Sequence, residues 1–258
     1  MLENYFVSTF NKRLYDSYGD RFLETFLKTE QSTHMFCYVE EDPNVYPSSE
    51  KITYLNIYEE CPNLEKFVKR FKDRKSPPPD RKYTLKQDDA LKFSFKVHAQ
   101  YAARNYGKRM FYVDFDCVFM DKIPTEWYEK YLEGVDFAYY ARPKYTETGF
   151  IAFTTENDLV QRFFEKYISF YVDDSLYNLE NGYHDCIVFD ETLKCFPERK
   201  ERIYGDRSSH TMTKCRVLNP FIDHRKGDRK NYLNSPEWYL SRQGKMIRKR
   251  AKWWSIYG

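Results

Sequence analysis

The segment FYVDFDCVF, residues 111–119, decides the fold because two carboxylates interrupt an otherwise apolar and aromatic run. Successive side chains of a β-strand point to opposite faces. If the segment is one strand, Asp114 and Asp116 therefore share a face, while Cys117 points the other way. An ionised carboxylate that is buried without a partner costs a large free energy. We therefore expect a positive charge to compensate this pair.

Apolar runs and helical spacings alternate on both sides of this segment. Leu64, Phe67, Val68 and Phe71, for example, recur at the i, i+3, i+4, i+7 spacing of an amphipathic helix. We expect strands at residues 4–10, 35–40, 52–58, 136–142 and 147–153, and helices up to about residue 28, after Pro62, and at 87–106 and 159–167. Residues 186–190 fit a strand or part of a short helix, and the proline-rich residues 75–82 must form a loop. This order predicts one α/β domain with a central, mostly parallel sheet flanked by helices.

Composition narrows the class of protein. Of the 258 residues, 41% are hydrophobic and 19% aromatic, which excludes a disordered chain. No apolar run approaches membrane-spanning length, and the first residues lack the pattern of a secretion signal. The six cysteines show no paired metal spacing, so we expect buried, reduced thiols in a soluble cytoplasmic protein. The sequence carries no signal for an oligomeric state.

The charge is distributed unevenly along the chain. From Arg225 to the end there are ten Lys or Arg against two acidic residues, so this segment carries about +8 and the remainder about −5. Trp238, Trp253 and Trp254 lie among these basic residues. Such a tail indicates an anionic partner such as a phosphate or a nucleic acid. The alternative is a tail that is simply solvated, which would carry the same charge.

The acidic pair has the chemistry of a metal site. In open α/β sheets, ligands bind beyond the carboxyl ends of the strands, where Asp114 and Asp116 are expected to lie. Two carboxylates there could share Mg²⁺ or Mn²⁺, which would bridge to the phosphates of a substrate. Two solvated acids at a strand end would give the same short pattern, so the hypothesis depends on other segments.

The segment FIDHRKGDRK, residues 221–230, supplies complementary groups. His224 offers a nitrogen ligand to the same cation. Gly227 lets the backbone pass close to a phosphate, and Lys230 adds positive charge there. A surface turn with an incidental histidine is the alternative.

These motifs together resemble a known group of enzymes. The DxD after a helix and the late H-x-x-G-x-x-K resemble the GT-A glycosyltransferases of the glycogenin and bacterial lipooligosaccharide galactosyltransferase type. Phage and bacterial glycosyltransferase-like proteins look closer still, through FSFKVHA (93–99), YVDFDCVF (112–119), YTETGFIAF (145–153), YHDCIVFD (183–190) and DHRKGDRK (223–230). The resemblance covers roughly residues 85 to 230.

The resemblance implies a fold and a donor. Residues 1–230 would form a GT-A, Rossmann-like nucleotide-sugar-binding domain, and residues 231–258 a basic, aromatic-bearing tail. The donor would be a nucleotide sugar, a UDP-sugar first, with its diphosphate on Mn²⁺ or Mg²⁺. Asp114, Asp116 and His224 would hold the cation, with Lys230 toward the diphosphate.

The remaining candidates surround these groups. Asp185 and Glu147 could orient sugar hydroxyls or accept the proton of the acceptor, which would decide between inversion and retention. His184 joins Asp185 as a catalytic candidate, or the two form a packed, hydrogen-bonded pair. Lys96 is a candidate contact for the diphosphate or ribose, or a solvated helix lysine. Ser8 and Thr9 end the first strand, where a nucleotide base could lie.

Two segments depart from the glycogenin pattern. Glu147-Thr148-Gly149 stands where glycogenin-type enzymes carry an Asn- or Ser-containing segment, and His184-Asp185-Cys186 replaces Asp-Gln-Asp. The donor sugar and the stereochemistry therefore do not carry over from the resemblance.

Three functions remain open from the sequence. The first is a glycosyltransferase, with hydroxymethylated bases of phage DNA as one acceptor, docked through the basic tail. The second is a metal-dependent nucleotidyltransferase or another phosphoryl-transfer enzyme, since paired aspartates serve these too. The third is a basic nucleic-acid-binding module without catalysis.

Overall fold

The computed structural model describes residues 1–73, 88–205, 212 and 215–225. The predicted loop at 75–82, the tail at 231–258, Gly227 and Lys230 lie outside these described residues. The helices are α1 Lys12–Leu14, α2 Asp20–Lys28, α3 Ile57–Glu60, α4 Pro62–Asp73, α5 Asp88–Ala103, α6 Thr125–Leu132, α7 Asp158–Val172 and α8 Asp185–Lys194. The strands are β1 Leu2–Phe10, β2 His34–Val39, β3 Ile52–Asn56, β4 Gly107–Val113, β5 Cys117–Phe119, β6 Phe137–Ala141, β7 Thr146–Thr154, β8 Glu201–Tyr204 and β9 Ile222–His224.

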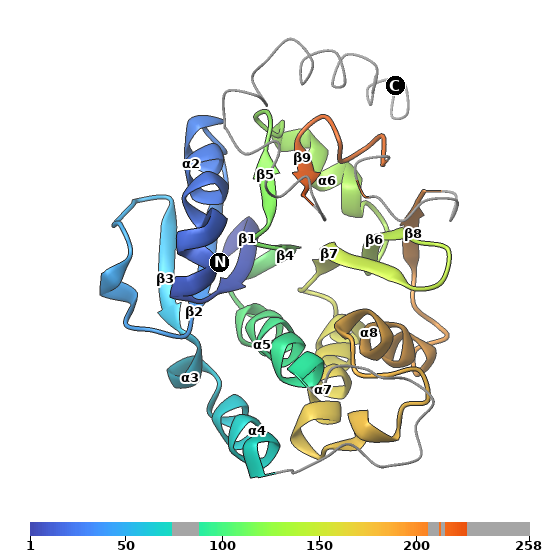
Figure 1. Ribbon diagram of the computed structural model, residues 1–258. Coiled ribbons are helices and arrows are strands. Elements are labelled where there is room, and N and C mark those ends of the chain that lie inside the picture. The colour runs from blue at the N-terminus through green and yellow to red at the C-terminus, as the bar shows by residue number, and fades with distance from the viewer. Residues whose placement is uncertain (74–87, 206–211, 213–214, 226–258) are drawn as a thin grey trace.

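In the described part of the chain, seven strands form one sheet in the order β3-β2-β1-β4-β7-β6-β8. The neighbours β3, β2, β1 and β4 are parallel, and β6 and β8 are parallel to each other. Among these described strands, only β7 runs against both of its neighbours, β4 and β6. The predicted α/β fold with a mostly parallel central sheet is therefore confirmed, and Figure 1 shows this sheet in the middle of the molecule.

Helices cover both faces of the sheet because the strands are apolar on both sides. Tyr5 and Val7 of β1 belong to a core shared with α4, α5, α7 and α8. Phe6 between them points to the other face, into a core shared with α2 and α6. Figure 1 shows α5, α7 and α8 on one side of the sheet and α2 and α6 on the other. Continuous apolar runs are typical of strands buried on both faces.

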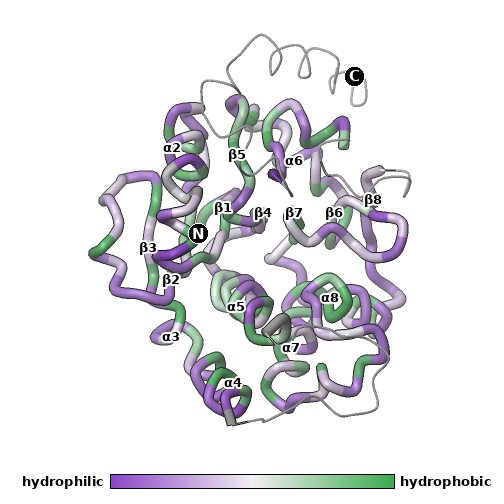
Figure 2. The backbone as a smooth tube through the Cα atoms, in the orientation of Figure 1, coloured by the Kyte–Doolittle hydropathy of each residue, from purple (hydrophilic) through white to green (hydrophobic). Residues whose placement is uncertain are grey.

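Most predicted elements are confirmed, including the amphipathic helix after Pro62. In α4, Leu64 and Phe67 are buried, and Figure 2 shows hydrophilic and hydrophobic residues alternating around this helix. Residues 186–190, left open between strand and helix, are part of α8. Short apolar runs do not distinguish these two structures by periodicity.

Residues 111–119 do not form one continuous strand, and Asp114 and Asp116 follow the end of a central strand as expected. The strand β4 ends at Val113, and the chain turns over Asp114–Asp116 before β5 begins at Cys117. The backbone N–H of Cys117 donates to the carbonyl of Asp114 at 3.0 Å, which closes the turn. Aspartate favours turns over strands, so the acidic pair itself breaks the strand. We call residues 114–116 the acidic turn.

A second, two-stranded sheet brings the end of the described chain to the acidic turn. Strand β5 pairs antiparallel with β9, and Cys117 is the direct partner of His224. The N–H of Arg225 donates to the carbonyl of Asp116 at 3.1 Å, which extends the contact to the turn. The hydrogen bonds between β5 and β9 therefore place His224 next to the carboxyl end of β4.

Two further sequence expectations concern thiols and membranes. All six cysteines are free, and five are buried as predicted, whereas Cys195 is exposed. Among the described residues, none of the helices combines the length and the apolar character that crossing a bilayer requires.

Candidate active site

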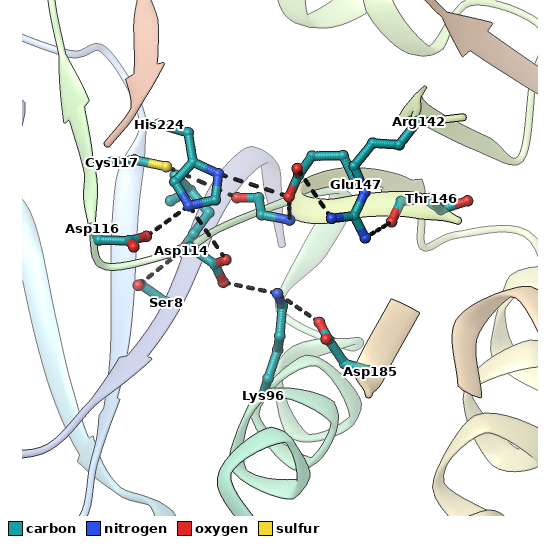
Figure 3. A network of polar contacts seen from close by, with 12 residues as sticks. Ser8, Lys96, Asp114, Asp116, Cys117, Arg142, Thr146, Glu147, Asp185 and His224 are labelled. Carbon is teal, nitrogen blue, oxygen red and sulfur yellow. Dashed lines mark hydrogen bonds and ion pairs between the residues drawn. The ribbon is translucent and has the colours of Figure 1, made fainter. Parts of the chain in front are cut away.

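The acidic turn and His224 meet at the carboxyl end of β4 (Figure 3). The Nε2 atom of His224 lies 2.9 Å from Oδ1 of Asp116 and 3.9 Å from Oδ2 of Asp114. The imidazole is 3% exposed, so the protein and not the solvent sets its position. The structure thus brings together three side chains that the sequence analysis grouped as metal ligands, and their role as ligands stays a prediction.

Phe115, between the two aspartates, anchors the acidic turn to the core. Its ring is buried and stacks on Phe10 with centroids 3.6 Å apart. It also packs against Phe22 at 4.9 Å. The turn is therefore anchored by its central residue, while Asp114 and Asp116 are directed toward His224.

Cys117 also lies beside Asp116 and His224, a neighbour that its position in the sequence did not predict. The ligand atoms of Asp116, Cys117 and His224 all lie within 4.8 Å of one another. Strand alternation had placed Cys117 on the face opposite the aspartates, but the turn interrupts that alternation. Burial, followed by the nearby carboxylates of Asp116 and Asp114, raises the pKa of the Cys117 thiol well above its ordinary value.

Lys96 of α5 connects the acidic turn to α8. Its Nζ lies 2.8 Å from Oδ1 of Asp114 and 2.7 Å from Oδ2 of Asp185. Burial alone would lower the pKa of Lys96, but the two carboxylates raise it above its ordinary value. The predicted alternative of a solvated lysine is wrong, because the Lys96 side chain is only 6% exposed.

Asp185 is held in its ionised form at the first position of α8. Burial alone would raise the pKa of Asp185, but the charge of Lys96, the hydroxyl of Thr148 and the N–H of Cys186 together lower it. The start of a helix favours a negative charge as well. Asp185 is consequently a weak proton acceptor at neutral pH.

Glu147 of β7 lies on the other edge of the His224 ring. Its Oε1 atom is 3.7 Å from Nδ1 of His224 and accepts a hydrogen bond from the N–H of Gly149 at 3.1 Å. The Nη1 atom of Arg142, the residue that directly follows β6, lies 3.8 Å from Oε2. Glu147 is 2% exposed, so these groups are its immediate environment.

Four carboxylates gather at this edge of the sheet. Within the described residues, Asp114 and Asp185 pair with Lys96. Glu147 pairs with Arg142, and Asp116 lies beside His224. Asp223 and Arg225, on either side of His224, pair with each other at 3.1 Å. Carboxylate oxygens together with one imidazole nitrogen are donors that suit Mg²⁺ or Mn²⁺. The residues present therefore fit such an ion.

The other predicted residues occupy different surroundings. The hydroxyls of Ser8 and Thr9 donate to the carbonyls of Val113 and Tyr38, at 2.8 and 2.9 Å, and so tie β1 to its neighbouring strands. His184 precedes α8, is half-buried, and lies 4.9 Å from the ring of Phe93. Gly227 and Lys230, with Lys230 expected toward a diphosphate, lie outside the described residues.

Comparisons with known proteins place the fold. No protein-family model matches the chain, and no curated protein matches its sequence. The structure is similar to the crystal structure of mouse xyloside xylosyltransferase 1 in its apo form, with a TM-score of 0.50 and 13% sequence identity. The match covers 78% of this chain and 85% of that chain. That enzyme is a glycosyltransferase of the GT-A type, so the predicted GT-A fold is confirmed for this chain.

Proposed function

We propose that the protein is a glycosyltransferase that transfers a sugar from a nucleotide sugar, using a divalent cation held by Asp114, Asp116 and His224. One observation carries the proposal. His224 lies 2.9 Å from Asp116 and 3.9 Å from Asp114, at the carboxyl end of a central strand in a GT-A fold. Ligands of open α/β sheets bind at this edge.

Sugar transfer needs stabilisation of the departing diphosphate, on which negative charge develops. A bound Mn²⁺ or Mg²⁺ supplies Lewis-acid stabilisation of that leaving group. Lys96 reaches the same place from the side of α5 as a buried, protonated amine. We propose that Lys96 donates hydrogen bonds to the diphosphate or to the donor sugar, and that Lys230 adds charge to the diphosphate.

Asp185 is proposed as an orienting residue on the acceptor side. A carboxylate with a lowered pKa, paired with Lys96 at 2.7 Å, accepts hydrogen bonds well but is a poor general base. We therefore assign it to sugar hydroxyls or to the Lys96 amine, with His184 next to it at the start of α8. Without a strong base in this position, retention of configuration is the favoured outcome.

The donor and the acceptor are proposed from the sequence. We propose a UDP-sugar as donor, with the base near Ser8 and Thr9 at the end of β1 and Gly227 close to a phosphate. The charge of the tail supports hydroxymethylated DNA bases as acceptor. Deleting residues 238–258 should weaken DNA binding and flatten its salt dependence. Unchanged binding would remove DNA from the list of acceptors.

The decisive test is nucleoside diphosphate release from a panel of nucleotide sugars with and without Mn²⁺. We expect slow hydrolysis of one donor that EDTA abolishes and that Asp116→Asn lowers by at least about 100-fold, a loss of roughly 2.7 kcal/mol of transition-state stabilisation. Glu198→Gln is the matched control, since Glu198 forms an exposed pair with Arg162. Release of pyrophosphate instead would identify a nucleotidyltransferase, and no turnover on any donor would contradict the proposal.

A further inference from the structure

The imidazole of His224 lies between two carboxylates from different parts of the fold. Its Nε2 atom is 2.9 Å from Asp116 of the acidic turn, and its Nδ1 atom is 3.7 Å from Glu147 of β7 (Figure 3). The two nitrogens of an imidazole are distinct, and the partner of one determines what the other can do. Glu147 faces the nitrogen that is turned away from the acidic turn.

The backbone of β7 is shaped to hold this arrangement. In the pairing with β6, Glu147 is opposite Tyr140 and Ile151 is opposite Tyr139, so β7 contains a bulge between these two pairs. Bulges redirect side chains and occur next to active sites. Gly149 lies in the bulge, and its carbonyl accepts from the N–H of Asp114 at 2.8 Å. One short stretch of β7 thus holds the backbone of the acidic turn and approaches the His224 ring.

Gly149 leaves the space that the ring needs. A Cβ atom at this position would lie 2.6 Å from both Cε1 and Nδ1 of His224, and 3.0 Å from Oε1 of Glu147. The two separations from His224 are shorter than real Cβ contacts, and the one from Glu147 is tight, so a side chain here would displace the imidazole. The absence of a side chain at Gly149 is therefore part of the contact between Glu147 and His224.

Two further groups hold the carboxylate of Glu147. Oε1 accepts from the N–H of Gly149 at 3.1 Å, and Arg142 lies 3.8 Å from Oε2. The guanidinium is itself anchored, because Nη2 donates to the carbonyl of Thr146 at 3.0 Å. A buried carboxylate requires such partners to remain ionised. The same Oε1 atom also faces Nδ1 of His224.

We propose that Glu147 is a positioning residue for His224: it accepts the Nδ1–H of the imidazole and so presents the lone pair of Nε2 toward Asp114 and Asp116. Once Nε2 serves as a ligand, Nδ1 carries the N–H of the neutral ring, and Glu147 faces it. Histidine ligands commonly donate their second N–H to a carboxylate, which fixes the tautomer and makes the ligand more basic. The inference depends on the proposed function for the cation, and it removes Glu147 from the acceptor side.

The test measures cation binding without any sugar donor. The dissociation constant for Mn²⁺, read from the free-ion electron paramagnetic resonance signal, is compared between the wild type, Glu147→Gln and the control Glu198→Gln. We expect Glu147→Gln to weaken binding by about 10- to 100-fold, the usual effect of removing such a partner. The control should bind like the wild type.

Two further measurements make the test independent of folding and of turnover. Glu147→Asp keeps the negative charge but shortens the side chain. This variant provides the test if Glu147→Gln fails to fold, and it should still weaken Mn²⁺ binding. In ¹⁵N-histidine-labelled protein loaded with diamagnetic Zn²⁺, His224 should show a protonated Nδ1 and a metal-bound Nε2. The Nδ1–H resonance should shift in the Glu147 variants.

The outcomes separate this inference from the proposed function. Unchanged Mn²⁺ affinity in both Glu147 variants, together with lost turnover, would make Glu147 an acceptor-side base and overturn the inference alone. Wild-type protein that binds Mn²⁺ in a Glu147-dependent manner but hydrolyses no nucleotide sugar would contradict the proposed function alone. Absence of Mn²⁺ binding by the wild type would overturn both.

Discussion

The Nζ of Lys96 lies 2.8 Å from Oδ1 of Asp114, so a buried amine on α5 holds the first aspartate of the acidic turn. The same amine lies 2.7 Å from Asp185 on α8. The Lys96 amine thus connects the acidic turn with α5 and α8. Asp114 is both a partner of Lys96 and a proposed ligand of the divalent metal ion. A change at Lys96 should therefore affect the stability of the fold as well as metal binding.

Lys96→Met should destabilise the fold. It leaves Asp185, whose side chain is 4% exposed, without its cation, and breaking a buried pair on one side costs about 3 kcal/mol or more. Urea unfolding monitored by circular dichroism measures the loss. The double variant Lys96→Met with Asp185→Asn should recover part of it, because no uncompensated charge remains at that position. Equal stability of the wild type and Lys96→Met would mean that the pair contributes nothing.

Phe115→Ala should loosen the acidic turn. The ring is 4% exposed and stacks on Phe10 with centroids 3.6 Å apart. A Cβ atom added at Gly19 would lie only 2.3 Å from the ring, so the ring is tightly packed. Removing a buried phenylalanine costs about 3–5 kcal/mol. Because this ring anchors the two aspartates, Mn²⁺ affinity should fall as well, which can be titrated under conditions where the variant is still folded.

A matched control separates these two effects of Phe115. Phe67→Ala removes an equally buried ring from α4 on the other face of the sheet. It should cost similar stability and leave Mn²⁺ affinity unchanged. If both variants weakened Mn²⁺ binding equally, general destabilisation and not the anchoring of the turn would be the cause.

The sequence predicted those parts of the site that follow from local pattern and strand direction. Asp114 and Asp116 follow a buried strand, and the carboxyl ends of parallel strands meet at one edge of a sheet. The spacing of His224 and Gly227 resembles a motif of GT-A glycosyltransferases, and this resemblance placed His224 beside the two aspartates. The prediction did not require knowing the path by which the chain returns to the sheet.

The remaining parts depend on tertiary contacts without a local signal. The pairing of Cys117 with His224 and the approach of Gly149 to the imidazole both require the two-stranded β5–β9 sheet and the antiparallel β7. The alternation of side chains that one strand would give does not reach Cys117, because a turn at residues 114–116 interrupts it. The tendency of two nearby aspartates to form a turn is the signal that could have corrected it.

His224→Ala should abolish the response to metal. Ligands that bind only the folded state stabilise it by mass action, by about 2.7 kcal/mol at 100 times the dissociation constant. Saturating Mn²⁺ should therefore raise the melting temperature of the wild type, and EDTA should reverse the shift. The His224→Ala variant should show no shift, whereas His184→Ala, at the half-buried position before α8, should keep it. A shift that persists in His224→Ala would place the ion elsewhere.

His98 should make the fold sensitive to mild acid. Its Nδ1 lies 2.8 Å from the carbonyl of Ser94, to which it donates, and Nε2 has no hydrogen-bond partner among the described residues. Burial lowers the pKa of His98 to about 4 from its ordinary 6.5. Between these values the unfolded chain binds a proton that the folded protein excludes, so stability falls as the pH falls. The slope of the unfolding free energy against pH approaches about 1.4 kcal/mol per pH unit, or roughly 3 kcal/mol over the whole interval.

The variant His98→Asn tests this pH dependence. Asparagine keeps a donor to Ser94 and cannot titrate, so the difference in unfolding free energy between wild type and variant should shrink by this amount from pH 7 to pH 4. A difference that stays constant over this range would show that His98 is protonated in the folded state as readily as in the unfolded chain.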